Sequence, residues 1–257
     1  MILALINALI VLFLLAPIIV VVATAFTTTA YPLFPPQGFT LRWFERFLTM
    51  TEFTDAVQRS ALLALVSTAI ASVLGTFSAL ALTRWRGPAR QAITSLMLSP
   101  IMFPAIVLGL ALLVFYSQIG LAGTFAGLVI AHSLVTTPFV IRLVMASLAE
   151  FDPAVEEAAR NLGAGWWRTF FQVTLPLIQP GVLAGAVFAF IISFDELVIT
   201  LFLAGPGMAT LPVRIYTFVE YSSAPTISAI SFVMLFTLVI LLVGTLTLTA
   251  KNEGQAR

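Results

Sequence analysis

Two carboxylates, Asp195 and Glu196, stand side by side in a run of otherwise apolar residues. At the centre of a membrane-spanning helix each would cost roughly 2.5–3.5 kcal/mol on insertion scales, whereas a neighbouring Leu, Ile, Phe or Val contributes only about 0.3–0.6 kcal/mol. Acidic residues in such runs usually face a cavity or a partner chain and mark a pathway. Phe190 and Phe194 precede the pair, and aromatic rings beside a carboxylate suit an ammonium group by charge and cation–π attraction. The pattern predicts a path for a cation.

Other interpretations of this region stay open. Adjacent helical residues point about 100° apart, so we expect one carboxylate of the pair to line the path fully while the other accepts structural hydrogen bonds. Tyr216 and Glu220 are further candidates near the outer mouth of the path. His132 stands alone among apolar residues, which favours a hydrogen-bonded packing role, and no second ligand pattern suggests a metal site.

Composition identifies the elements that must position these side chains. The chain has 257 residues, of which 60% are hydrophobic and 9% charged, against about 25% charged in a soluble domain. Too few polar residues are present to cover a water-facing surface, which excludes a soluble enzyme, a secreted disulfide scaffold and a nucleic-acid binder. Neither catalytic residues nor a resident cofactor are indicated. The chain is predicted to be a polytopic membrane protein.

Gaps between the charged residues measure the membrane segments. A helix needs about 20 apolar residues to cross the hydrocarbon core, and continuous apolar runs favour helices over a barrel. The expected spans cover residues 3–26, 60–83, two within 91–141 that are separated by a break at 117–123, 181–203 and 226–250. We therefore expect an all-α protein with six transmembrane helices, organised as a single transmembrane domain over residues 1–257.

The distribution of Lys and Arg predicts the orientation. With both termini in the cytoplasm, the inner side holds eight basic residues: Arg84, Arg86, Arg90, Arg142, Arg160, Arg168, Lys251 and Arg257. The outer side then holds four: Arg42, Arg46, Arg59 and Arg214. The excess of basic residues inside favours this arrangement. The first segment lacks a basic n-region and exceeds the 7–15 apolar residues of a signal peptide, so we interpret it as a retained helix.

The longest inner segment, residues 150–180, has its own helix signals. Asp152-Pro153 is typical of a helix start, and Leu162-Gly163 of a helix stop. The amphipathic stretch 166–171 follows, and Pro176 and Pro180 close the segment. We expect a short helix, a glycine turn and a second helix on the cytoplasmic face; the alternative is a connector that lies on the membrane surface.

Within this segment one spacing is specific. Glu157-Ala158-Ala159 is followed after three residues by Gly163 and, nine residues later, by Val173-Thr174-Leu175-Pro176. This resembles the EAA loop (E-A-A-x3-G-x9-I-x-L-P) of permease subunits in bacterial ATP-binding-cassette (ABC) importers, with Val173 at the Ile position. The resemblance extends over nearly the whole chain, because the six-helix layout agrees with it.

A narrower resemblance lies downstream. The stretches 193–200, 203–207 and 210–213 are similar to the spermidine/putrescine permease subfamily, in particular to its PotC-like subunits. Residues 221–225, after Glu220, depart from that subfamily's pattern. The resemblance implies a polyamine or a related amino-containing cation as the solute.

The resemblance also implies a fold, partners and site residues. The fold would be that of type I ABC importer permeases, also called MetI-like. The EAA segment would be a coupling helix that docks on an ATPase, with these residues involved: Glu157, Ala158, Ala159, Gly163, Leu175 and Pro176. The partners would be a second, PotB-like permease, two copies of the ATPase, an extracytoplasmic solute-binding protein and lipid of the bacterial inner membrane. ATP and Mg²⁺ would bind the ATPase, since Lys251 is the single Lys of this chain and no P-loop is present.

Two rival functions remain at this point. One is an intramembrane enzyme that uses Asp195, Glu196 or His132, although no catalytic motif accompanies them. The other is a proton-coupled secondary transporter, although no internal repeat is evident. Neither explains the EAA spacing.

Overall fold

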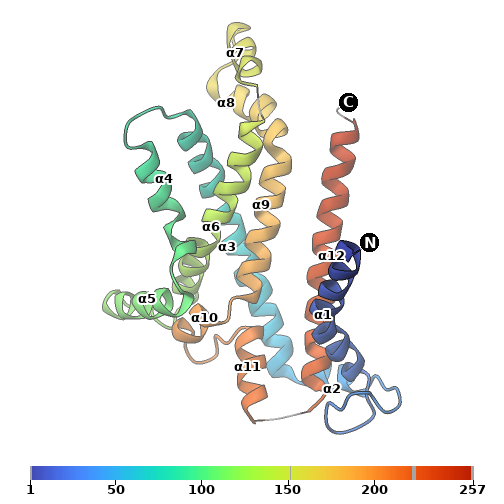
Figure 1. Cartoon of the computed structure of the whole chain (residues 1–257). Coiled ribbons are helices and arrows are strands. Elements are labelled where there is room, and N and C mark those ends of the chain that lie inside the picture. The colour runs from blue at the N-terminus through green and yellow to red at the C-terminus, as the bar shows by residue number, and fades with distance from the viewer. Residues whose placement is uncertain (1, 151, 222–223, 256–257) are drawn as a thin grey trace. The chain divides into compact units, whose positions relative to one another are not determined.

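A computed structural model describes residues 2–150, 152–221 and 224–255, and all elements in these ranges are helical (Figure 1). Residue 151 of the inner segment and Arg257, one of the basic residues counted inside, lie outside the described residues. The elements in chain order are α1 (Ile2–Ala25), α2 (Arg42–Thr49), α3 (Thr51–Arg84), α4 (Arg90–Leu98), the 3-10 turn η1 (Ser99–Met102), α5 (Ala105–Ile119), α6 (Phe125–Ala149), α7 (Pro153–Asn161), α8 (Trp166–Thr169), the π-helical turn η2 (Phe170–Thr174), α9 (Leu175–Asp195), α10 (Val198–Leu203), α11 (Leu211–Tyr221) and α12 (Thr226–Gln255).

Among the described residues five helices have the length and composition to cross a membrane, and a bent pair of helices, taken as one span, makes six, as predicted. Five are single helices, namely Leu3–Ala25, Thr51–Arg84, Phe125–Ala149, Trp166–Asp195 and Thr226–Gly244. The remaining segment, third in chain order, is the pair Arg90–Met102 and Ala105–Ile119, whose two helices are bent by 101° relative to each other. Phe103 is extended at the bend because the following Pro104 disfavours helical geometry in the residue before it. The third span is therefore broken, at the place where Pro100 and Pro104 in its apolar run predict a kink.

The fifth span differs from its predicted bounds of 181–203. It begins at Trp166, because helical structure continues through α8, η2 and α9, and it ends at Asp195. Pro176 and Pro180 do not close the inner segment but lie inside the helix. The wide turn of η2, in which the Leu175 N–H reaches back to the carbonyl of Phe170, directly precedes Pro176, which has no N–H to donate.

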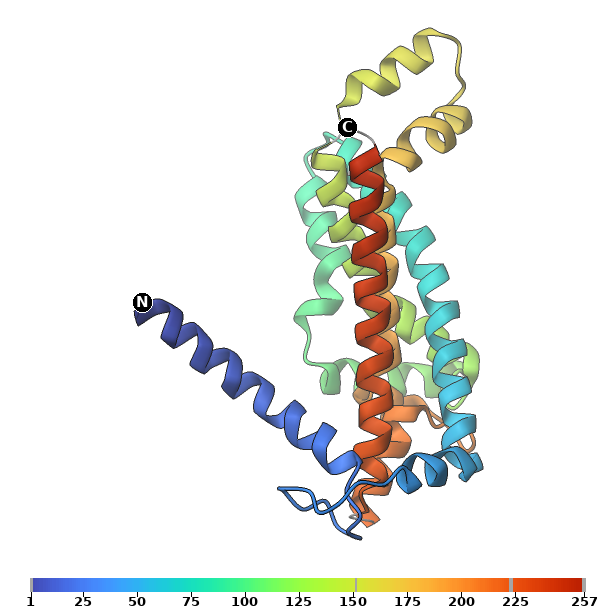
Figure 2. The ribbon, with the colours of Figure 1, turned by 90° about the vertical axis from the view of Figure 1, so that its right-hand side faces the viewer.

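The described chain forms two compact units. One comprises Met1–Gln58 and Leu211–Leu241, and the other comprises Arg59–Thr210 and Leu242–Arg257. In the first unit α1 and α12 meet near the C-terminal end of α1, where the Thr24 hydroxyl donates to that of Ser228 at 3.1 Å, and they diverge beyond it (Figure 2). Short α2 packs there too: Trp43 is buried, and its indole N–H donates to the carbonyl of Thr27 at 2.7 Å.

The second unit is built around α6 and α9. These helices approach closely because small residues of α9 face α6: a Cβ at Gly181 would lie 2.8 Å from the carbonyl oxygen of Leu143, and one at Gly185 would lie 3.1 Å from the Cα of Val140. Apolar residues of α3, α6 and α9 form the surrounding core. Within this unit α7 and α8 lie at one end of the α6–α9 pair, and α5 and α10 lie at the other (Figure 1).

Candidate coupling and substrate-path sites

The inner segment folds as its helix signals predict. The Asp152 carboxylate caps α7 by accepting from the Ala154 N–H at 2.9 Å, and Pro153 occupies the first turn. Gly163 ends the helix with φ +89°, a left-handed conformation that costs other residues about 1–2 kcal/mol. Its N–H donates to the carbonyl of Arg160 at 2.9 Å, which closes the turn before α8.

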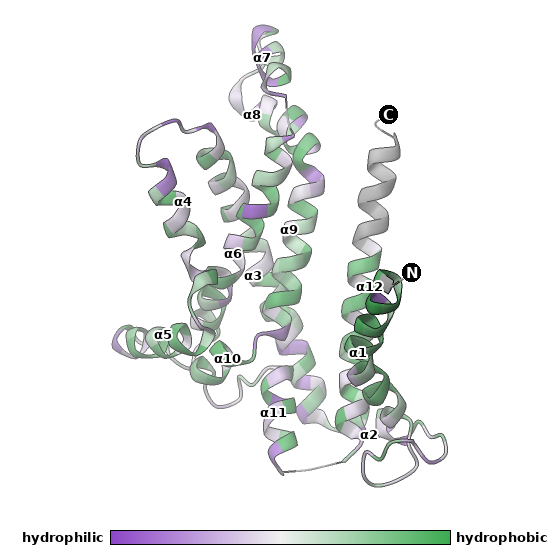
Figure 3. Ribbon diagram, in the orientation of Figure 1, coloured by the Kyte–Doolittle hydropathy of each residue, from purple (hydrophilic) through white to green (hydrophobic). Residues whose placement is uncertain are grey.

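The expected coupling residues are spread over two elements. Glu157 and Ala158 are exposed on α7, Ala159 is half-buried there, and Gly163 is exposed in the turn. Leu175 and Pro176 instead belong to the first turn of α9, where Leu175 is half-buried. The turn is also apolar: Leu162 is 90% exposed and Trp167 is 61% exposed. In Figure 3 hydrophilic residues concentrate on α7 and in the loop between α3 and α4.

Glu156, the neighbour of Glu157, is buried. Its carboxylate pairs with the guanidinium of Arg84 at the end of α3 and with that of Arg160 at 3.8 Å, and it accepts from the Thr174 hydroxyl at 2.5 Å. The spacing of Arg160, four residues on, was visible in the sequence. The contacts with Arg84 and Thr174 were not, since those residues lie 72 and 18 positions away.

The two carboxylates of the fifth span flank the end of a helix rather than its middle. Asp195 is the last residue of α9 and Glu196 is its extended C-cap. A helix of 30 residues from Trp166 to Asp195 is about 45 Å long at about 1.5 Å per residue, longer than the hydrocarbon core of about 30 Å. Asp195 therefore lies at the end of the span remote from α7.

The structure separates the roles of this acidic pair. The Glu196 side chain is half-buried, and its Oε1 accepts from the Ile199 N–H at 2.9 Å, which satisfies a free donor in the first turn of α10. Asp195 is exposed and has neither an ion pair nor a hydrogen bond within the part of the chain that the structure describes. Phe190 and buried Phe194 stack with ring centroids 5.7 Å apart on the last turns of α9.

His132 holds the break between α9 and α10 from the side of α6. One ring nitrogen, Nδ1, lies 2.8 Å from the hydroxyl of Ser193, and the other, Nε2, lies 3.0 Å from that of Thr200. The imidazole is 1% exposed, so the two contacts satisfy both of its nitrogens inside the protein. The prediction of a hydrogen-bonded packing residue is confirmed. Among the described residues no group of three or more His, Cys, Asp or Glu is placed to hold a metal ion.

Tyr216 and Glu220 are exposed on α11, which belongs to the other compact unit. In that unit α11 is joined to the start of α3 by the Arg214–Glu52 ion pair at 3.3 Å and by an edge-on contact of Phe218 with Phe53. Both candidates thus lie one turn apart on α11 with exposed side chains.

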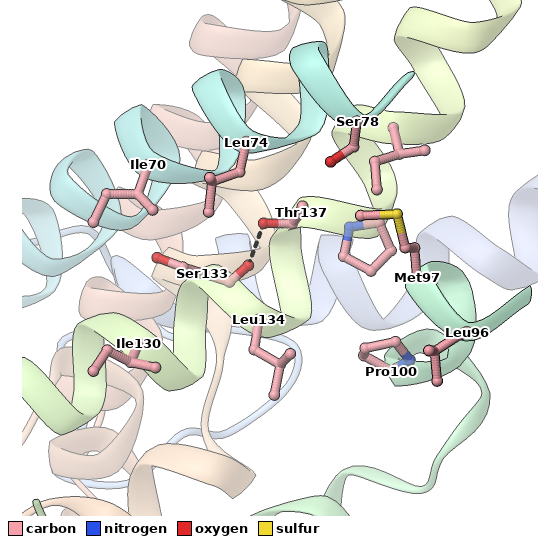
Figure 4. Close-up of a pocket in the computed structure, with 12 residues that line it drawn as sticks. Ile70, Leu74, Ser78, Leu96, Met97, Pro100, Ile130, Ser133, Leu134 and Thr137 are labelled. Atoms are coloured by element: carbon pink, nitrogen blue, oxygen red, sulfur yellow. Dashed lines mark hydrogen bonds between the residues drawn. The ribbon is translucent and has the colours of Figure 1, made fainter. Parts of the chain in front are cut away.

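Sequence reasoning missed a cavity of about 510 Å³ between α3, α6 and the bent third segment (Figure 4). It is lined mainly by apolar side chains, among them Leu74, Met97, Pro100 and Leu134. Ser133 also lines it; its carbonyl accepts from the Thr137 hydroxyl at 2.6 Å, while its own buried hydroxyl has no partner among the described residues. From the third segment the cavity takes Leu96, Met97 and Pro100, which precede the bend; Pro100 and Pro104 indicate a kink in this span but not a cavity beside it.

Comparison with known proteins places these features in a family. Residues 71–250 match the family described as "Binding-protein-dependent transport system inner membrane component". The chain is 30% identical over 244 residues to the spermidine/putrescine transport system permease protein PotC of Escherichia coli K12, covering 95% of this chain and 92% of PotC. It is 32% identical over 230 residues to the putrescine transport system permease protein PotI of the same organism, covering 87% and 82%.

Solved structures agree on the fold. A bacterial ABC transporter that imports alginate matches with a TM-score of 0.74 at 17% identity, covering 95% of this chain and 94% of that one. The MetNI methionine ABC transporter matches with a TM-score of 0.64 at 17% identity, covering 80% and 98%. The expected type I permease fold is thus confirmed. The chain belongs to the family of binding-protein-dependent transport system inner membrane components, as a multi-pass transport subunit of an ABC importer whose ATPase is a separate polypeptide.

Proposed function

We propose that this permease imports a polyamine such as spermidine or putrescine, or a related cation with amino groups. The observation that carries the proposal is the exposed carboxylate of Asp195, which has no partner among the described residues and directly follows the helical turn that carries the stacked rings of Phe190 and Phe194. A carboxylate next to aromatic faces attracts ammonium groups. Identities of 30% to PotC and 32% to PotI support the same solute class.

Asp195 is the principal path residue in this proposal, and Glu196 supports it by capping α10. Phe190 and Phe194 would contribute ring faces or edges, and Tyr216 and Glu220 would add polar groups at the outer mouth. The proposed orientation, with both termini in the cytoplasm, puts Asp195 on the outer side, where a solute arriving from outside first meets the permease.

The proposed coupling device is the EAA segment. Glu157, Ala158, Ala159 and Gly163 would contact the ATPase, with Leu175 and Pro176 at the root of the fifth span. The exposure of Glu157 and of the apolar turn at Leu162 supports docking into a groove of a partner. The partners in this proposal are a second, PotB-like permease, two ATPase copies that bind ATP and Mg²⁺, and a solute-binding protein outside.

The test is uptake into proteoliposomes that contain the complete complex with its binding protein. We expect labelled spermidine or putrescine to be taken up only when ATP is present inside the vesicles. Unlabelled polyamine should suppress this uptake, and a neutral amino acid should not. Uptake driven by a proton gradient without ATP would select the secondary-transporter alternative. ATP-dependent uptake of an anionic or neutral solute, with polyamines inactive, would overturn the proposed solute class.

A further inference from the structure

Glu156 is the only residue of α7 that the structure buries. It is 7% exposed, whereas its neighbours Val155 and Glu157 lie on the outer surface of the helix. Removing a carboxylate from water is unfavourable unless ion pairs and hydrogen bonds replace the lost hydration. The chain therefore holds this side chain inside for a reason other than apolar packing.

Three partners from three elements replace that hydration. Arg84 is the last residue of α3, and its guanidinium pairs with Oε1. Thr174, buried at the junction of η2 and α9, donates its hydroxyl to the same oxygen at 2.5 Å. Arg160, one turn further along α7, lies 3.8 Å from Oε2. A single carboxylate thus joins α7 to the inner ends of the second and fifth spans.

This position matters because α7 has no other buried side chain. A helix that rests on a protein without an apolar face can tilt or slide independently of what lies beneath it. Force applied to α7 can reach the spans through the flanking backbone and through its packing on α8 and η2, and this carboxylate adds a charged link to the end of α3.

We infer that Glu156 is a positioning residue that ties the movement of α7 to α3 and α9. The inference rests on the proposed docking of α7 on the ATPase. Displacement of α7 is carried by the Arg84 pair to the second span and by Thr174 to the fifth span, at whose far end Asp195 lies. The two neighbouring carboxylates thereby have different roles. Glu157 faces the ATPase, and Glu156 contacts the membrane helices.

The test uses the complete complex in proteoliposomes and compares ATP hydrolysed with solute taken up. Glu156→Gln keeps the size and an acceptor for Thr174 but removes the charge that pairs with Arg84. We expect the number of ATP molecules hydrolysed per solute molecule taken up to rise about fivefold or more. Fivefold is about the lower end of the usual range for the coupling between two sites of a protein. Arg84→Gln should raise the ratio in the same direction, and Thr174→Val should do so more weakly.

Glu150→Gln is the matched control, because Glu150 is an exposed carboxylate just before the same loop. It should leave the ratio at the wild-type value. The amount of ATPase that co-purifies and the thermal unfolding temperature distinguish coupling from folding. If uptake and hydrolysis both fall in proportion to assembled complex, Glu156 is merely structural and the inference is overturned.

The variant Glu157→Gln distinguishes the role of Glu156 from the proposed docking of α7 on the ATPase. If Glu157→Gln uncouples hydrolysis from uptake and Glu156→Gln does not, the role of Glu156 is wrong while docking through α7 stands. If neither change affects the ratio, the proposed coupling through α7 falls as well.

Discussion

Two adjacent acidic pairs, Glu156–Glu157 and Asp195–Glu196, lie at opposite ends of the α6–α9 pair in the second unit, and both are divided in the same way. In each pair one carboxylate is engaged inside the protein and the other is exposed without a partner among the described residues. The engaged members differ in what they hold. Glu156 binds charged side chains from distant elements, whereas Glu196 binds a backbone N–H three residues away.

The difference shows two ways to separate neighbouring side chains. Glu156 and Glu157 diverge because successive residues of a continuous helix point about 100° apart. Asp195 and Glu196 diverge because the helix stops between them. The first device makes a connection between elements that can transmit force, and the second makes a local cap that leaves one carboxylate accessible beside a rigid break.

The largest expected effect concerns His132. At the Asp195 end of the α6–α9 pair this neutral side chain of α6 joins α9 to α10 by hydrogen bonds, where Glu156 joins elements by ion pairs at the other end. His132→Ala leaves the buried hydroxyl of Ser193 without its partner, at a cost of about 1–3 kcal/mol, whereas the hydroxyl of Thr200 loses one contact but still donates to the carbonyl of Glu196 at 2.9 Å. We expect a thermal unfolding temperature in detergent that is lower by several degrees. Arg142→Gln, an exposed change on the same helix, is the control and should have no effect. Equal stability of His132→Ala and wild type would show that the break is held by other contacts.

The division of the second acidic pair predicts unequal effects on transport. Asp195→Asn removes the exposed charge and should raise the apparent KM for a polyamine about tenfold, equivalent to about 1.4 kcal/mol. Glu196→Gln keeps an oxygen that can accept from the Ile199 N–H and should alter KM about twofold or less, by the same conversion. Measuring initial uptake rates over a range of solute concentrations decides the matter. Similar rises in both variants would contradict the separation of roles.

The most local expected effect concerns the turn after the first acidic pair, where two glycines differ only in backbone geometry. Gly163 has φ +89° and Gly165 has φ −67°, and a Cβ would meet no atom within 4 Å at either position. Gly163→Ala should therefore destabilise the turn by about 1–2 kcal/mol, while Gly165→Ala should be nearly neutral. Faster proteolysis between α7 and α8 in the first variant alone would report the difference. If both variants are cut at the same rate, the left-handed turn does not control the loop.

Much of this architecture could be predicted from local signals. Apolar runs revealed six membrane segments, and Asp152-Pro153 and Leu162-Gly163 revealed the ends of α7, because capping and turn chemistry depend on neighbouring residues. Pro100 and Pro104 predicted a kink in the third span, and the structure bends there, but the size of the bend, 101°, could not be predicted because a proline in an apolar run permits several geometries. The end of α9 at Asp195 was not predicted, because a polar residue in an apolar run does not by itself end a helix. The Arg84–Glu156 pair joins residues 72 positions apart, which one sequence cannot reveal.

The bent third segment also bears on the synthesis of the chain. Its halves have 13 residues (Arg90–Met102) and 15 residues (Ala105–Ile119), both short of the roughly 20 that a crossing helix needs. Neither half alone is a strong signal to the insertion machinery, whereas α6, with 25 residues, is. The apolar residues of α5 pack in a cluster with residues of α3 and α6 and with Ile199 and Leu203 of α10, and these last two leave the ribosome some 80 residues later. Until α10 is synthesised, the part of the α5 surface that it covers in the finished protein has no protein partner.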